Sequence, residues 1–158
     1  ISNGAFYFCT SLTSITIPTS VTTISNGVFA FTSLTSISIP SSINTISTYV
    51  FSSCSSLISI TIPTSVNTIG RSAFQSCSSM TSISIPTSVN TVSEYAFSDC
   101  SSVAVISIPT SVTIIESYVF QHCTLLTDIY FPTTLKYISS GAFLGSSYIE
   151  WRTKVVPG

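Results

Sequence analysis

The chain has 158 residues, enough for one domain with a buried core, yet only 6% of them are charged and the formal net charge is −1. Four Lys and Arg residues cannot form the basic patch with which a nucleic-acid-binding protein neutralises phosphates. No apolar run approaches the roughly 18 to 20 residues of a membrane-spanning helix, because Pro, Ser and Thr interrupt every candidate. The first charged side chain is Arg71, so we expect uncharged polar and Tyr side chains on the surface of residues 1–70.

A repeat of 22 to 23 residues runs through the chain. Each unit has the pattern Leu-x-x-Ile-x-Ile-Pro-x-Ser-Val-x-x-Ile, followed by Phe and in most units by Cys. The prolines are Pro18, Pro40, Pro63, Pro86, Pro109 and Pro132, and the phenylalanine column is Phe6, Phe29, Phe51, Phe74, Phe97, Phe120 and Phe143. Such a period is typical of a solenoid in which each unit forms one coil. We therefore predict six to seven coils over residues 1–147.

The segment before each proline is predicted to be a strand with one buried face, because apolar residues alternate there with Ser or Thr. Proline then ends the strand, since it has no N–H to donate to a parallel neighbour. The inward pairs are Ile15 and Ile17, Ile37 and Ile39, Ile60 and Ile62, Ile83 and Ile85, Ile106 and Ile108, and Ile129 and Phe131.

A second inward pair follows each proline, from Val21 and Ile24 in the first unit to Leu135 and Ile138 in the last. The Ala-Phe or Val-Phe stretch after this pair is predicted to be a turn or a single helical turn. No unit can cover its own apolar row, so neighbouring coils must stack about 4.8 Å apart and bury a continuous core.

The motif LTSITIP followed by SV, AF and CSSL resembles the BspA-like leucine-rich repeats, and the resemblance covers nearly the whole chain. It implies a repeat solenoid of the leucine-rich-repeat type, mainly β, with a parallel sheet on one face and turns or short helical turns on the other. It also implies a location outside the cell and binding to matrix proteins or other cells. The family supplies no catalytic residues to carry over.

Outward hydroxyl side chains form ladders that are our candidate sites for binding or glycan attachment. They are Ser14, Thr16, Ser36, Ser38, Ser59, Thr61, Ser82 and Ser84 before the prolines, and Thr23, Thr45, Thr68 and Thr91 after them. The simplest interpretation is that such residues suit an exposed pleated surface. Three functional hypotheses stand beside it: O-linked glycans, a protein or glycan partner, and ice binding by analogy with other threonine-ridged solenoids. The sequence has no Asn-x-Ser/Thr sequon for N-linked glycans.

A cysteine column contains Cys9, Cys54, Cys77, Cys100 and Cys123. A metal site is not predicted, because there is no C-x-x-C motif and only one His. Stacked positions are close enough for a disulfide such as Cys54–Cys77, but the odd number of thiols favours buried free cysteines that act as small apolar residues.

One column places Ser76, Asp99 and His122 at intervals of 23 residues. Asp99 would lie in the middle, whereas a catalytic triad needs its His there, so we predict no catalysis and no cofactor. Asp99 with His122, and Arg71 with Glu94, are instead expected to form surface contacts worth at most about 1 kcal/mol.

Residues 148–158 change the pattern by alternating apolar with mostly charged side chains, and they are predicted to form a capping strand or tail. The first residue, Ile1, falls halfway through a coil. We expect its exposed edge to be covered either by further repeats or a cap, or by another copy of the chain.

Together these features favour an extracellular or cell-surface repeat protein, non-enzymatic, that serves adhesion or protein or glycan binding. The alternative is a structural subunit whose copies stack head to tail into an extracellular fibre, since residues 1–70 carry no charge to repel a partner. Ice binding through the Thr ladders is the lesser alternative.

Overall fold

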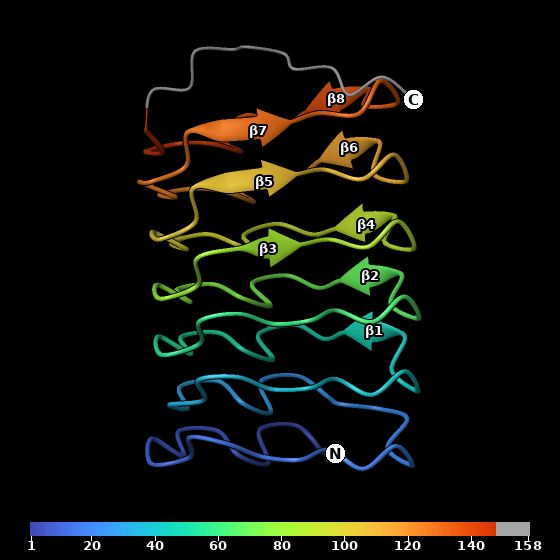
Figure 1. Ribbon diagram of the computed structural model, residues 1–158, viewed down its shortest axis with the longest axis vertical. Coiled ribbons are helices and arrows are strands. Elements are labelled where there is room, and N and C mark those ends of the chain that lie inside the picture. Colours follow the sequence, from blue (N-terminus) through green and yellow to red (C-terminus); the bar gives the residue numbers. More distant parts are fainter. Residues whose placement is uncertain (148–158) are drawn as a thin grey trace.

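The computed structural model describes residues 1–147. The chain winds into a column of stacked coils, with its N-terminus in the lowest coil and the rising sequence climbing one coil at a time (Figure 1). We number the coils one to seven by their member of the phenylalanine column. The described residues contain parallel strands and turns but no helix. The predicted mainly β repeat solenoid is confirmed.

The first sheet is built from the segments before the prolines. Its strands are β3 (Ile83–Ser84), β5 (Val105–Ser107) and β7 (Asp128–Tyr130), paired in parallel in that order. Equivalent residues of successive coils lie side by side, so that Ile106 pairs with the residues 23 positions before and after it. An isolated parallel bridge between Ser38 and Thr61 extends this register toward the N-terminus.

The predicted inward residues of these segments are buried, except at the two ends of the column. Ile15 and Phe131 are partly buried and pack against the core. Both lie in coils that have a neighbour on one side only within the described chain.

A second parallel side follows each proline, where the sequence predicted an inward pair but not a strand. It comprises β1 (Thr45–Ile46), β2 (Thr68–Ile69) and β4 (Thr91–Val92) in one sheet, and β6 (Ile114–Ile115) with β8 (Tyr137–Ile138) in another. Figure 1 shows these strands running opposite to β3, β5 and β7, because the proline turn reverses the chain.

From Pro40 onward, two hydrogen bonds hold each proline turn. Its last N–H donates to the proline carbonyl, as from Val66 to Pro63 at 3.0 Å, and its Ser hydroxyl donates to the carbonyl of the preceding coil, as from Ser65 to Ile43 at 2.6 Å. The same hydroxyl bond recurs at Ser42, Ser88 and Ser111, whereas the Thr134 hydroxyl donates to Thr110 O in the proline turn of the preceding coil. The Ser of the repeat motif therefore links coils rather than facing a ligand.

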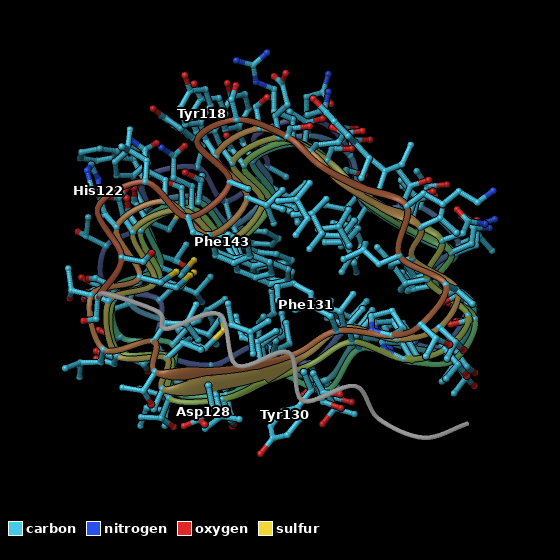
Figure 2. All side chains as sticks on the ribbon, turned by 90° about the horizontal axis from the view of Figure 1, so that it is seen from above. Tyr118, His122, Asp128, Tyr130, Phe131 and Phe143 are labelled. Atoms are coloured by element: carbon cyan, nitrogen blue, oxygen red, sulfur yellow. The ribbon has the colours of Figure 1, made fainter. Side chains whose placement is uncertain are left out.

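The third side of each coil is a run of turns around the phenylalanine, which we call the turn side. Two columns of residues there have positive φ, one two positions before the phenylalanine and one two positions after it. The first column contains Gly4, Gly27, Tyr49, Ser72, Tyr95, Tyr118 and Gly141; the second contains Phe8, Phe31, Ser53, Ser76, Asp99, His122 and Gly145. Tyr118 and His122 mark the two columns on the rim of the coil in Figure 2.

Backbone hydrogen bonds on the turn side run from each coil to the next one. For example, Phe74 N donates to Ala96 O at 2.9 Å and Ser76 N donates to Ser98 O at 2.8 Å. Between the strands β2 and β4 the direction is opposite, since Ser93 N donates back to Ile69 O at 2.9 Å. Every internal coil thus uses backbone N–H donors and backbone C=O acceptors to bond to the coil before it and to the coil after it.

Stacked phenylalanine rings form the centre of the core. From Phe6 to Phe143, successive rings lie 5.3 to 5.8 Å apart between centroids, with interplanar angles of no more than 11°. The five internal rings are completely or almost completely buried. The invariant ring in each unit is therefore a packing residue, and sequence periodicity alone identified it.

The predicted capping strand at 148–158 lies outside the described residues. Within residues 1–147, no helix has the length and apolar character needed to cross a membrane.

Candidate functional site

The outward residues before the prolines form one exposed surface, which we call the hydroxyl face. Its members are Ser14, Thr16, Ser36, Ser38, Ser59, Thr61, Ser82, Ser84 and Ser107, and all are exposed. Within residues 1–147 their hydroxyls make no side-chain hydrogen bond, so they are free to meet a partner. The face changes character at its C-terminal end, where Asp128 and Tyr130 point away from the core (Figure 2).

The second group of predicted residues lies on a different sheet from the hydroxyl face. Thr45, Thr68 and Thr91 pair in register along β1, β2 and β4 and are partly buried. Each hydroxyl donates to the side-chain carbonyl of the Asn before it, at 3.3, 2.9 and 2.9 Å respectively. The equivalent residues of the next coils are Ile114 and Tyr137, so the ladder of threonines ends at β4. The structure therefore brings the two predicted groups onto separate sides of the coil.

The column of Ser76, Asp99 and His122 adopts the order that the sequence predicted. His122 Nδ1 lies 3.1 Å from Asp99 Oδ1, and the Ser98 hydroxyl donates to Asp99 Oδ2 at 2.7 Å. Asp99 stands between Ser76 and His122 along the column, so the His cannot take a proton from the Ser. The predicted surface contact is confirmed, and the column carries no triad geometry.

The predicted contact between Arg71 and Glu94 is also confirmed, with Nη1 3.6 Å from Oε2. The Arg71 guanidinium lies over the Tyr95 ring, 5.5 Å from its centroid. Both ends of the ion pair are about half exposed, so solvent screens it. Among the described residues, no group of His, Cys, Asp and Glu side chains is arranged to hold a metal ion.

Four cysteines of the column are buried and free, as predicted. Each thiol donates to the phenylalanine carbonyl of the preceding coil, for example from Cys77 Sγ to Phe51 O at 3.2 Å. The same bond occurs at Cys54, Cys100 and Cys123. A hydroxyl occupies this position in two other coils, where Thr32 contacts Cys54 Sγ and Ser146 donates to Phe120 O. The column thus needs a small donor, and no disulfide forms within it.

Burial makes these thiols poor nucleophiles. Desolvation raises the pKa of Cys54, raises the pKa of Cys77 and Cys100 well above the ordinary value, and raises the pKa of Cys123 to about 12. The thiolate is the reactive form, so all four stay unreactive near neutral pH. The prediction of burial is wrong for Cys9, which lies in coil one and is exposed.

We expect iodoacetamide to label one cysteine per native chain at pH 8, at Cys9, while all five react once the chain is unfolded in urea. Peptide mass mapping after timed labelling measures this. The variant Cys9→Ser is the control and should leave the native chain unlabelled. Labelling of Cys77 at a rate comparable to Cys9 would contradict the buried thiol column.

The sequence interpretation missed a groove on the turn side, which we call the aromatic groove. It has a volume of about 550 Å³ and spans coils one to four. Its lining includes Tyr7, Phe31 and Tyr49, together with Asn26, Gln75 and Ser76. A signal was present in the repeat itself: the column of Phe31, which also contains Phe8, holds Ser, Asp, His or Gly in the other coils. The sequence pattern did not predict the groove, because it does not show which columns lie next to each other on the turn side.

The geometry defines a class of protein: a parallel solenoid with one repeat per coil, built on the leucine-rich-repeat plan. The model of the BspA type leucine rich repeat region matches residues 1–102 and 45–153, with six copies. The chain belongs to the BspA-type leucine-rich repeat family.

Several solved structures are similar to the chain. One is a leucine rich cell surface protein from Faecalibacterium prausnitzii A2-165, with 33% identity over 83% of this chain and 38% of that one, and a TM-score of 0.76. Another is a leucine-rich repeat protein from Eubacterium ventriosum ATCC 27560, with 28% identity over 99% of this chain and 42% of that one, and a TM-score of 0.85. The chain thus spans about two fifths of the length of these proteins. A search of the curated proteins found no match.

Proposed function

We propose that the chain is a non-enzymatic recognition module of an extracellular or cell-surface protein, and that its hydroxyl face binds a protein ligand in adhesion. The family supports the surface location, since a similar structure is described as a cell surface protein. The observation that carries the proposal is the hydroxyl face itself. It is an exposed surface of Ser and Thr, interrupted at β5 by the exposed Val105, with no charge before Asp128.

Such a surface suits a protein partner for two reasons. The hydroxyl groups are short and rotate freely, so they can donate or accept wherever the partner presents a complementary group. The short side chains also lose little conformational entropy when a partner orders them. Parallel pairing sets Ser84 beside Ser107, and an isolated parallel bridge sets Ser38 beside Thr61, so the spacing of the hydroxyl rows is fixed at these positions.

The proposal is tested by immobilising a panel of matrix proteins and mucins and measuring attachment of beads coated with the chain. The double variant Ser59→Glu/Ser82→Glu places on the hydroxyl face two charges that the bound ligand would bury, and should reduce attachment at least about tenfold. The matched control Thr64→Glu/Thr87→Glu places the same charges at the same spacing in the exposed proline turns and should leave attachment unchanged. Equal loss in both variants would exclude the hydroxyl face as the binding surface.

A glycan array with the same variants separates the ligand classes. Retention of the chain by glycans, with loss in the Ser59→Glu/Ser82→Glu variant, would replace the protein ligand with a glycan at this face. O-linked glycans on the ladders, ice binding and head-to-tail fibres stay predictions from the sequence. Intact mass, thermal hysteresis and negative-stain microscopy of the native material are their respective tests.

A further inference from the structure

We propose that the aromatic groove on the turn side binds an uncharged saccharide, independently of the hydroxyl face. Tyr7, Phe31 and Tyr49 line it and are 54%, 39% and 43% exposed. Its volume of about 550 Å³ falls within the range of small-ligand sites. The groove therefore has both the size and the exposed aromatic surface that a bound ligand of several sugar units requires.

The backbone under the groove indicates that the aromatic residues are not there for folding. Phe31, which lines the groove, and Phe8, which lies beside it, have φ of 60° and 61°, a left-handed conformation that costs an L-residue on the order of 1 kcal/mol or more. The same column holds Ser53, Ser76 and Gly145 in other coils, so the position does not need a ring. Burial does not compensate the cost, because Phe8 is 60% exposed and Phe31 is 39% exposed. Strained, exposed bulky residues of this kind are typical of functional sites.

The rings are also held in place by one another. Phe31 lies 5.6 Å from Tyr7 and 5.3 Å from Phe8 between ring centroids, and Tyr7 lies 5.8 Å from Phe8. Tyr7, Phe8 and Phe31 each have two rotatable side-chain bonds and two ring neighbours. A platform arranged before binding loses little entropy when a ligand stacks on it.

The polar groups of the groove set the chemistry of the ligand. Asn26 and Gln75 offer amides that donate and accept, and Ser53 and Ser76 offer hydroxyls. Among the described residues, no charged side chain lines the groove. A pyranose matches this combination, since its C–H face packs on an aromatic ring while its hydroxyls pair with amides and hydroxyls at the rim. A charged polysaccharide would find no counter-ion.

The test is calorimetric titration of the full chain with cellohexaose, maltohexaose, xylohexaose and mannohexaose, with a heparin hexasaccharide as the anionic probe. We expect at least one neutral hexasaccharide to bind and heparin not to bind. The variant Phe31→Ser copies the residue that coils three and four carry in this column, and should weaken binding at least about tenfold. Its melting temperature should stay within a few degrees of the parent, because the ring is exposed and strained.

Two controls make the result specific to the groove. Tyr137→Ser removes an exposed ring from β8, on another side of the coil, and should bind like the parent. Ser59→Glu/Ser82→Glu should also retain the saccharide, which distinguishes this proposal from the one for the hydroxyl face. Failure of all four neutral probes, stronger binding of heparin, or an unchanged affinity in Phe31→Ser would each overturn the proposal. An apolar dye that binds the parent but not Phe31→Ser, with no saccharide bound, would indicate a protein-docking patch instead and would overturn it too.

Discussion

Replacing Phe74 by Ala is expected to lower the free energy of unfolding by about 3–5 kcal/mol, the range for a fully buried phenylalanine. The Phe74 ring stacks between Phe51 at 5.4 Å and Phe97 at 5.3 Å, so its loss leaves a cavity bounded on two sides by rings. The turn-side backbone, bonded forward and backward at this coil, limits how far the gap can close. Urea denaturation followed by circular dichroism measures the change.

The control for this prediction is Phe6→Ala, in the first coil. Phe6 is partly buried and stacks on Phe29 alone, so its loss should cost roughly half as much or less. Equal destabilisation by the two substitutions would contradict the view that an internal ring is held by both neighbours.

Replacing Gly141 by Ala is expected to cost about 2–3 kcal/mol, through two separate effects. The residue has φ of +74°, which disfavours any Cβ by about 1 kcal/mol or more. In addition, a Cβ would lie 2.8 Å from Tyr118 Cδ1 and closer still to Cε1, because the Tyr118 ring packs over the glycine. The ring would have to leave its stack on Tyr95, whose centroid is 4.9 Å away.

Two further substitutions separate the backbone effect from the steric one. Gly27→Ala lies in the same column with φ of +62° but has no atom within 4 Å of the new Cβ, so only about 1 kcal/mol should be lost. In a Tyr118→Ala background the cost of Gly141→Ala should fall to a similar value. Thermal unfolding of the parent, Gly141→Ala, Tyr118→Ala and the double variant provides the double-mutant cycle. An undiminished cost in the Tyr118→Ala background would rule out the ring as its cause.

The sequence predicted the contacts between equivalent positions of neighbouring coils. The repeat places each residue beside the residue 22 or 23 positions away. The stacked rings, the parallel register and the contact of Asp99 with His122 therefore followed from spacing alone. The four buried thiols followed from the same logic. Cys9 did not, because the column rule assumes a coil on both sides.

The sequence did not predict how one coil bends. The second set of strands is two residues long in each coil, too short for an alternating pattern to stand out from the inward pair that it contains. The left-handed columns were hidden because most of their members are not Gly, and Tyr49 or Ser72 gives no signal of positive φ. Without the bend, the Thr ladder could not be separated from the hydroxyl face, nor Tyr7, Phe31 and Tyr49 brought together.

The opposite directions of hydrogen bonding on the turn side and between the strands β2 and β4 have a consequence for chain length. The backbone donors and acceptors on one side of an internal coil match those of the coil on its other side. A whole unit of 23 residues can therefore be inserted between two coils, or removed, with the inter-coil hydrogen bonds preserved. Gain or loss of one unit beyond coil four shifts everything after it by about 4.8 Å and leaves the aromatic groove of coils one to four unaltered. The number of repeats therefore sets the length of the column, and the residues on each coil set what it can bind. These two properties can change separately.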